Sequence, residues 1–279
     1  MGLLVLNDRR IYRKDRRLFS IFIYINQFLI MKNIIVLIAI IAISCGTPLF
    51  AQQEEERALA DFKAVSLDYG IQAELIKGTS NKVVLIVEGT KVDNVSSEIE
   101  GGQLLLTFKK TNKLDGVSVS AKIYTSGAIE GISINNKSVL SVKDVPAASN
   151  LKIAVSTGSK LDMTAKTQSA VVSISRSAKV QMAIETTELD ATIAGQGKLE
   201  VTGKAETLKV NANTAGVYKG YGLQCKSLTA QAHGNGRMEV TVTESLVANV
   251  VSGGKVYYRG DPELKVNATS SGLVEKAKD

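Results

Sequence analysis

The segment Leu189-Asp-Ala-Thr-Ile-Ala-Gly-Gln-Gly-Lys-Leu-Glu-Val201 returns two copies later as Leu228-Thr-Ala-Gln-Ala-His-Gly-Asn-Gly-Arg-Met-Glu-Val240. In each segment, three alternating apolar residues precede a corner of small residues, and a second alternating stretch follows. Such self-similarity at a short, fixed period is typical of a solenoid. The seven copies, about nineteen residues apart, begin at Leu151, Ala170, Leu189, Leu208, Leu228, Leu246 and Leu264.

Four positions of the repeat are apolar, and they define its core. With the first residue of a copy as offset zero, offsets zero, two and four alternate, so they share one face of a strand. Offset ten of the second strand continues this face as Leu161, Val180, Leu199, Tyr218, Met238, Val256 and Val274. A single copy cannot bury such a face, whereas stacked copies can. The sequence therefore predicts an all-β fold, a single parallel β-solenoid with regular coils over residues 151–276.

A β-sandwich with regularly spaced strands is the alternative fold. Sandwich strands need not keep the same residue types at matching positions, however, and this repeat does keep them. The corner adds a further expectation. We expect a left-handed backbone conformation at offset eight, because glycine tolerates it and five copies carry glycine there. These residues are Gly197, Gly216, Gly236, Gly254 and Gly272.

Upstream of the repeat, strand patterns continue without a fixed period. Residues 62–69, 72–76, 83–87, 104–108 and 117–124 alternate or run apolar, and Ile132 and Leu140 fit a degenerate further coil. No stretch rich in Pro or Gly separates the two parts. We therefore expect one domain over residues 52–279, with a less regular N-terminal β segment that continues the same sheets.

The chain begins with segments that do not read as part of this domain. Residues 31–51 combine Lys32, an apolar run of about ten residues and a small residue before Gln52, as in a signal peptide cleaved after Ala51. Residues 1–30 are too long for the start of such a peptide, so we interpret them as a non-native extension. A membrane anchor over residues 18–43 is the alternative, although polar residues interrupt it.

Cys45 offers a different route to the membrane. It follows a small residue at the end of the apolar run, as in a bacterial lipoprotein signal, although Ala42 stands where leucine is usual. Lipidation at Cys45 would tether the protein to a membrane surface, whereas cleavage after Ala51 would release it. Either route predicts export to the periplasm, cell surface or medium.

The charge balance argues against nucleic acid as a partner. The chain has a formal net charge of +7, and residues 1–51 contribute +5 of it, with seven basic and two acidic side chains. The remaining +2 is too small to create the basic field that nucleic-acid binding needs.

Few side chains offer chemistry. His233 is the only histidine of the chain, and its corner position suits a solvated turn residue better than a catalytic base or a zinc ligand. Cys225 is the only cysteine after residue 51, so it cannot form an internal disulfide, and we expect it to pack near a corner. The sequence thus predicts no catalytic, cofactor-binding or metal-binding residues, and it leaves the binding residues unknown.

Two charged rows mark the outer face of the second strand. Offset nine is basic in five of seven copies: Lys160, Lys179, Lys198, Val217, Arg237, Lys255 and Leu273. Offset eleven is acidic in four of seven: Asp162, Gln181, Glu200, Lys219, Glu239, Tyr257 and Glu275. Because stacking places the rows about 7 Å apart, we expect them to neutralise each other rather than to bind an anionic polysaccharide. At offset three, Asn211, Gln231, Asn249 and Asn267 predict a ladder of stacked amides.

Several segments resemble a known family. They are Phe62-Lys-Ala-Val-Ser-Leu-Asp-Tyr-Gly70, Val83–Val87, Gly102-Gln-Leu-Leu-Leu-Thr-Phe108, Gly131-Ile-Ser-Ile-Asn135, Tyr258-Arg-Gly-Asp-Pro262 and Ser270-Ser-Gly272. With them the chain resembles the putative autotransporter adhesin head GIN domain family of secreted Bacteroidetes-type proteins, over nearly all of residues 52–279. The resemblance implies a right-handed β-helix-like solenoid, and it brings no active-site residues.

Together these observations predict an exported, non-enzymatic protein of the cell envelope or surface. Its expected role is adhesin-like binding of extracellular glycan or protein, or a structural one, with membrane contact only through a lipidated Cys45. The alternative function is a polysaccharide-acting enzyme, because β-helices host carbohydrate chemistry in other proteins, although that analogy rests on fold alone.

Overall fold

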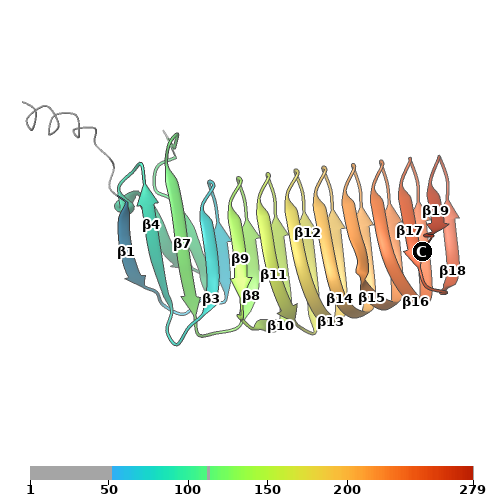
Figure 1. The fold of residues 1–279 in the computed structure, drawn as a ribbon, viewed down its shortest axis with the longest axis horizontal. Coiled ribbons are helices and arrows are strands. Elements are labelled where there is room, and N and C mark those ends of the chain that lie inside the picture. The colour runs from blue at the N-terminus through green and yellow to red at the C-terminus, as the bar shows by residue number, and fades with distance from the viewer. Residues whose placement is uncertain (1–51, 112–113, 279) are drawn as a thin grey trace, which may run out of the picture. The chain divides into compact units, whose positions relative to one another are not determined.

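The computed structural model describes residues 52–111 and 114–278, and these residues form a stack of β coils (Figure 1). Their only helix is the short 3-10 turn η1 (Val92–Asn94), and no helix in this described part is long and apolar enough to cross a membrane. The predicted extension over 1–30, the signal peptide over 31–51 and the lipidation site at Cys45 lie outside the described residues.

The regular coils pair their strands in parallel, each coil with the one before and the one after it. Strands β13 to β16 are long because each runs through the second strand of one coil and bends into the first strand of the next. Parallel pairing confirms the solenoid and excludes the sandwich, whose sheets are antiparallel. The strands are β8 (Ile129–Ile134), β9 (Val139–Lys143), β10 (Ala147–Val155), β11 (Lys160–Lys166), β12 (Ser169–Ile174), β13 (Lys179–Ile193), β14 (Lys198–Ala212), β15 (Val217–Ala232), β16 (Arg237–Val250), β17 (Lys255–Arg259), β18 (Glu263–Ala268) and β19 (Leu273–Lys276).

The register of the stack is the one that the repeat predicts. Leu189, Leu208 and Leu228 are direct neighbours across β13, β14 and β15. At offset ten, Tyr218 lies opposite Leu199 on one side and Met238 on the other. These inward positions are buried along the stack, so like residues form ladders through one core. Each fully buried leucine contributes about 2 kcal/mol of hydrophobic free energy.

The last coil departs from this pattern. Leu264 occupies offset zero, yet it is 45% exposed, whereas Leu246 one coil earlier is 0% exposed. The expectation that every offset-zero leucine is buried is therefore wrong at Leu264. The reason is that no described coil follows β18 and β19, so the inward face of the terminal coil has no neighbour on one side.

The corner turns explain the glycines differently from the sequence prediction. The central residues of the turn, such as Thr214 (φ 48°) and Ala215 (φ 60°), have positive φ, as in a type I′ turn. The offset-eight residue Gly216 does not, and its N–H closes the turn by donating to the Asn213 carbonyl at 2.9 Å. A Cβ on Gly216 would lie 2.2 Å from the Ile193 carbonyl oxygen in the preceding coil. Glycine recurs at offset eight because adjacent coils approach closely there.

The N-terminal segment is threaded out of sequence order. It contains β1 (Gln53–Ala58), β2 (Ala64–Leu67), β3 (Gln72–Lys77), β4 (Lys82–Glu88), β5 (Val95–Glu100), β6 (Gln103–Phe108) and β7 (Ser118–Thr125). The coil β2–β3 lies between the coil β6–β7 and the coil β8–β9, with parallel pairing on both sides. The segment therefore continues both sheets, and the predicted degenerate coil is β8–β9.

Antiparallel strands cover the outer edges of the coil β6–β7. Strand β4 pairs antiparallel with β7, β1 pairs antiparallel with β4, and β5 pairs antiparallel with β6. Arg57 on β1 ties the two sheets together, because its guanidinium donates to the carbonyl oxygens of Val95 at 2.7 Å and Val92 at 3.1 Å. The chain thus closes this end of its own solenoid.

Candidate functional site

The predicted charged rows form on the outer face of the sheet that contains β11, β17 and the first halves of β13 to β16. Offsets nine and eleven are each aligned from strand to strand. Ion pairs link the rows within a strand, with 3.2 Å between Lys198 and Glu200 and 2.8 Å between Arg237 and Glu239. Of the five basic side chains at offset nine, four are exposed and Lys198 is half-exposed. The predicted mutual neutralisation is present in these coils.

The amide row at offset three is also aligned as predicted. Asn211, Gln231 and Asn249 are neighbours across β14, β15 and β16. The Asn267 side-chain amide donates to the Asn249 Oδ1 at 3.4 Å, which is a long hydrogen bond. This row contributes to coil stacking and offers no shaped site.

One part of the charged face differs from the rest because it carries aromatic rings. We call the cluster of Tyr221, Arg237, Glu239, Tyr257 and Arg259 the Tyr–Arg patch. The Arg237 guanidinium carbon lies 4.3 Å from the centroid of the Tyr257 ring, and that of Arg259 lies 4.3 Å from the Tyr221 ring. Glu239 holds Arg237 through bonds to its Nε at 3.1 Å and its Nη2 at 2.8 Å. Both rings are half-exposed.

An irregularity in β15 places Tyr221 in this patch. The copy that begins at Leu208 has twenty residues, and its pairing with β16 slips between Gly220 and Gln224. The slip leaves Tyr221 outside the regular register, as in a β-bulge. The Thr241 hydroxyl donates to the Tyr221 carbonyl at 2.9 Å and fixes the bulge against β16. The inserted segment thus aims an aromatic side chain at the neighbouring coils.

The patch lies in a mostly basic surrounding. Lys219 is the strand neighbour of Glu239, and Lys255 is the strand neighbour of Arg237. Burial raises the pKa of the Tyr221 phenol above its usual value, and Glu239 adds to that effect while Arg259 opposes it. The phenol therefore stays protonated at neutral pH and can donate a hydrogen bond. Aromatic faces beside guanidinium groups suit a ligand that presents an apolar ring face next to an anionic group.

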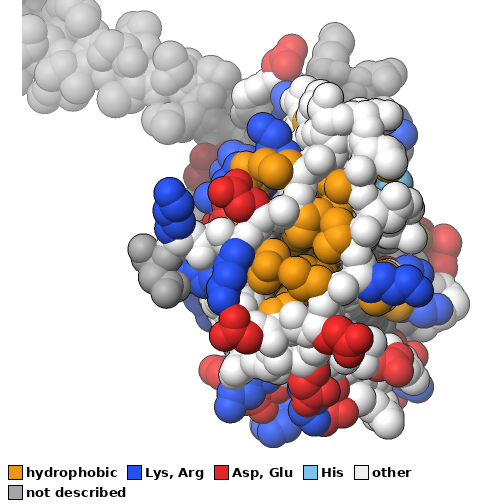
Figure 2. Space-filling view, turned by 90° about the vertical axis from the view of Figure 1, so that its right-hand side faces the viewer, with side chains coloured by type: hydrophobic (Ala, Val, Ile, Leu, Met, Phe, Trp, Pro, Cys, Tyr) orange, Lys and Arg blue, Asp and Glu red, His pale blue; other side chains and the backbone are white. Residues whose placement is uncertain are grey.

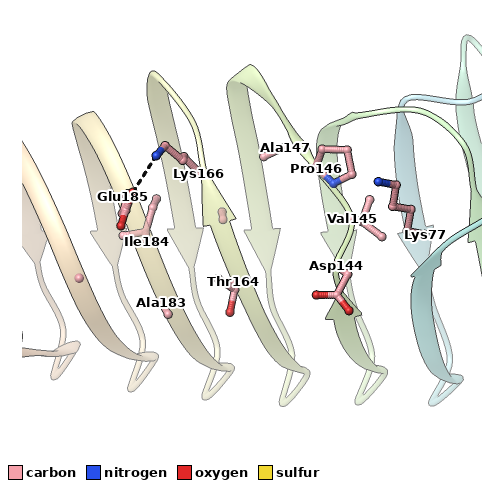
Figure 3. A pocket seen from close by; sticks show the side chains of 12 residues that line it. Lys77, Asp144, Val145, Pro146, Ala147, Thr164, Lys166, Ala183, Ile184 and Glu185 are labelled. Carbon is pink, nitrogen blue, oxygen red and sulfur yellow. Dashed lines mark ion pairs between the residues drawn. The ribbon is translucent and has the colours of Figure 1, made fainter.

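A groove runs along the second corner of the coils (Figure 3). Its volume is about 650 Å³. Val145, Ala165 and Ile184 are buried and form part of its apolar floor. Lys166 and Glu185 form an ion pair of 3.1 Å at its rim. The remaining lining residues are Lys77, Asp144, Pro146, Ala147, Thr164, Ala183 and Gly203.

A second hollow follows the same corner over β14 to β16. It has a volume of about 540 Å³ and shares Glu185 with the first groove. Lys226 and Glu206 pair across it at 3.2 Å. Lys204 and Glu244 add one charge of each sign to its lining. Because the charges along this corner alternate, the groove offers an apolar floor but no strong field of one sign.

His233 and Cys225, which were considered from the sequence as possible reactive groups, have structural roles. His233 is half-buried rather than solvated, and its backbone closes a corner turn with Gly236. Cys225 is buried, as predicted, and its thiol donates to the Thr241 carbonyl at 3.5 Å. Burial raises the pKa of Cys225 to about 12, so the reactive thiolate does not form at neutral pH. In residues 52–111 and 114–278, no group of three or more His, Cys, Asp or Glu side chains is placed to hold a metal ion.

Tyr218 fills the core where other coils have Leu, Val or Met. It is fully buried, and its hydroxyl has no hydrogen-bond partner in the described part of the chain. A Cβ on Gly220 would lie 2.2 Å from the Tyr218 ring, so Gly220 makes room for the ring. The bulge after Gly220 therefore serves packing as well as the Tyr–Arg patch.

Sequence reasoning missed the Tyr–Arg patch. It treated Tyr257 as one member of the offset-eleven row and gave Tyr221 no role. Two signals were present, namely the twenty-residue copy that contains Tyr221 and the sequence Tyr257-Tyr-Arg259. The contact between them depends on the bulge, which the repeat pattern does not show.

Several solved structures have the same fold as this chain. A protein named "putative adhesin" from Parabacteroides merdae matches with a TM-score of 0.75 and 19% identity, covering 81% of this chain and 96% of its own. A second one, from Parabacteroides distasonis, matches with a TM-score of 0.76 and 21% identity, covering 81% and 97%. A "putative lipid binding protein" from the same species matches with a TM-score of 0.72 and 18% identity, covering 81% of this chain and 97% of its own. At these identities the likeness concerns the fold.

No curated protein sequence matches the chain. A family model does match, and its description is "Putative auto-transporter adhesin, head GIN domain". It covers residues 61–262, which include the strands from β2 to β17 and the Tyr–Arg patch. The resemblance seen in the sequence is thereby confirmed, and the chain belongs to the head GIN domain family of putative auto-transporter adhesins.

Proposed function

We propose that this protein is an exported, non-enzymatic binding module of the cell envelope or surface, and that its partner is an extracellular glycan with acidic groups. The observation that carries the proposal is the Tyr–Arg patch, where two half-exposed rings and two guanidinium groups meet on one sheet face. Membership of an adhesin family supports an exported binding role.

The chemistry of the patch favours an acidic sugar over a neutral one. A sugar ring presents C–H groups on one face, and these pack against the face of a tyrosine ring. A carboxylate or sulfate on the sugar accepts paired hydrogen bonds from a guanidinium. Arg259 has no carboxylate ion pair among the contacts of the described residues, whereas Arg237 is held by Glu239. Arg259 is therefore the group that we expect to contact the anion.

A protein partner is the second candidate, and the corner groove favours it. The floor around Val145 and Ile184 is apolar, and its rim carries Lys166 and Glu185. An extended segment with small apolar side chains would fit such a floor. The fold neighbour named a lipid binding protein makes an acyl chain a further ligand to include in binding screens.

The polysaccharide-acting enzyme remains the competing class. Hydrolysis of a glycosidic bond uses two carboxyl groups at a fixed separation, one on each side of the bond. At the Tyr–Arg patch the central carboxylate is Glu239, and it is bound by Arg237 at 2.8 Å. Its neighbours in the row are Lys219 and Tyr257, and the next acid, Glu275, lies one strand beyond Tyr257 on the same flat face.

Binding of polygalacturonate, with neutral dextran as the comparison polymer, tests the proposal. We expect Tyr257→Ala to weaken polygalacturonate binding at least about fivefold, because an aromatic contact is worth about 1 kcal/mol. The matched control is Tyr124→Ala, which removes a half-exposed tyrosine beside Lys82 elsewhere on the same sheet. Equal weakening by both variants, or equal binding of dextran, would contradict the proposed site. Release of new reducing ends would contradict the non-enzymatic role.

A further inference from the structure

The terminal coil leaves its core open on one side. Leu264 and Val266 on β18 are 45% and 44% exposed, although the same offsets are buried in the preceding coils. Figure 2 views this end and shows hydrophobic side chains gathered in its middle, with charged side chains of both signs around them. Among residues 52–111 and 114–278, no strand pairs with the outer edges of β18 and β19.

The opposite end of the stack shows how this fold closes a terminal coil. There the edge strands β6 and β7 are each covered by an antiparallel strand, β5 and β4. A terminal coil of this solenoid therefore accepts antiparallel strands on both sheets at once. The same kind of partner would complete the outer edges of β18 and β19.

We propose that a second copy of this chain supplies those strands, so that two solenoids join end to end about a two-fold axis normal to the sheets. Rotation by 180° about such an axis reverses the strand direction, so β18 meets its own copy in antiparallel orientation, and so does β19. Opposed residues lie on the same side of an antiparallel pair. The inward side chains of one copy therefore meet the inward side chains of the other.

The residues of β18 suit this arrangement. In a register centred on Val266, that residue lies opposite Val266 of the second copy, and Leu264 lies opposite Ala268. On the outer face Lys265 lies opposite Asn267, so no like charges meet. Because apolar residues of β18 would oppose apolar ones in both copies, this strand is self-complementary, as a two-fold interface requires.

Head-to-tail stacking fits less well. At the other end the edge strand β1 has the sequence Gln53-Glu-Glu-Glu-Arg-Ala58. This strand lies in the same sheet as β19, so head-to-tail stacking would place its inward-facing Glu55 against the apolar inward side of β19. Burying a carboxylate against apolar side chains is costly. Charged edge strands of this kind discourage pairing with further sheets. The two ends therefore differ, and only the β18–β19 end has the apolar surface of an interface.

The proposed dimer would also change how the protein binds. The Tyr–Arg patch lies on the outer face of β15 to β17, and rotation about the sheet normal keeps both patches on the same face of the dimer. Tyr257 and its copy would lie on strands that are three spacings apart, about 14 Å. One polymer chain could then contact both patches, which raises avidity without any new contact.

The molar mass of the protein in solution tests this interface, and this measurement does not depend on glycan binding. A chain that begins at Gln52 retains every coil and the described core, so its mass can be measured by light scattering across a range of concentrations. We expect the dimer mass, and we expect Leu264→Lys and Val266→Lys to give the monomer mass. The matched control is Val247→Lys on the outer face of β16, a valine that is 43% exposed and should leave the dimer intact.

A cysteine variant tests the register and guards against misfolding of the lysine variants. Under oxidation we expect Val266→Cys to form a disulfide-linked dimer, whereas Val247→Cys should not. A wild-type chain that stays monomeric at every concentration would overturn the proposal. Cross-linking through Val247→Cys but not Val266→Cys would also overturn it, because the contact would then lie on a different face.

Discussion

Leu208 shows what the inward position requires of a single residue. Its side chain is 1% exposed and lies between Leu189 and Leu228 of the adjacent coils. Leu208→Asp would place a charge there without a partner, at a cost that exceeds the stability of most domains. We expect no cooperative thermal transition in circular dichroism. Lys209→Ala is the control, because it removes only the exposed ion pair with Asp190 and should cost less than about 1 kcal/mol. An unchanged melting temperature for Leu208→Asp would show that the register is wrong.

At the corner turn, a small residue can be required by close contact with the preceding coil or by a positive φ. Gly216→Ala would bring a Cβ within 2.2 Å of the Ile193 carbonyl oxygen, so the coils must move apart. We expect a loss of about 1–3 kcal/mol, as for other overpacked positions. Ala215→Gly should not destabilise, because Ala215 already has a φ of 60° that glycine adopts without strain. Urea unfolding of both variants measures the difference, and equal losses would refute the steric explanation.

Burial of Cys225 makes the stability of the folded chain depend on pH. The pKa of Cys225 is raised to about 12 in the folded chain because burial disfavours the thiolate, whereas the unfolded thiol keeps its ordinary value of 9.0. Because the folded state holds the thiol proton more tightly than the unfolded state, the free energy of unfolding is highest below the unfolded pKa. It falls as the pH rises from the unfolded pKa toward the folded pKa. We expect the urea midpoint to fall between pH 9 and pH 12, and Cys225→Val to reduce that fall. A fall of the same size in the variant would assign the effect to other groups, such as Tyr218.

At the scale of elements, the N-terminal cap depends on one side chain. Arg57 on β1 donates to the Val95 and Val92 carbonyl oxygens and to the Ser97 hydroxyl at 3.2 Å. Because hydrogen bonds from a charged donor contribute about 1.5–3 kcal/mol, Arg57→Ala should open this end first. Hydrogen exchange should show lost protection in β1 and β5 and retained protection in β14. Uniform loss across all strands would mean that the cap and the coils unfold as one unit.

The elements also show how far sequence reasoning reaches. The ladder of Leu189, Leu208 and Leu228 was predictable because the repeat has leucine at the same position of each coil. When the coils stack, equivalent positions become direct neighbours across the strands. The out-of-order coil β2–β3 was not, since the strand pattern of Ala64–Leu67 is the same whichever coil it joins. The Tyr–Arg patch was not predictable either. It depends on a bulge at Tyr221, and bulges follow from local pairing rather than from hydrophobic period.

At the scale of the whole molecule, export is the first expectation to test. Residues 31–51 read as a signal peptide, and Cys45 offers lipidation as the alternative. N-terminal sequencing of the protein recovered from its native envelope separates the two. A start at Gln52 indicates cleavage after Ala51, and a blocked, lipid-modified Cys45 indicates a tether. An intact Met1 would contradict export by either route.

The central claim is that the solenoid is a binding module whose Tyr–Arg patch holds an acidic glycan. The most direct test is an array of acidic and neutral glycans, probed with the wild-type chain and with the double variant Tyr221→Ala, Tyr257→Ala, beside an assay for polymer cleavage. We expect the wild type to bind acidic glycans, the double variant to lose this binding while keeping its circular dichroism spectrum, and no polymer to be cleaved. Binding that survives the double substitution, or turnover of any polymer, would contradict it.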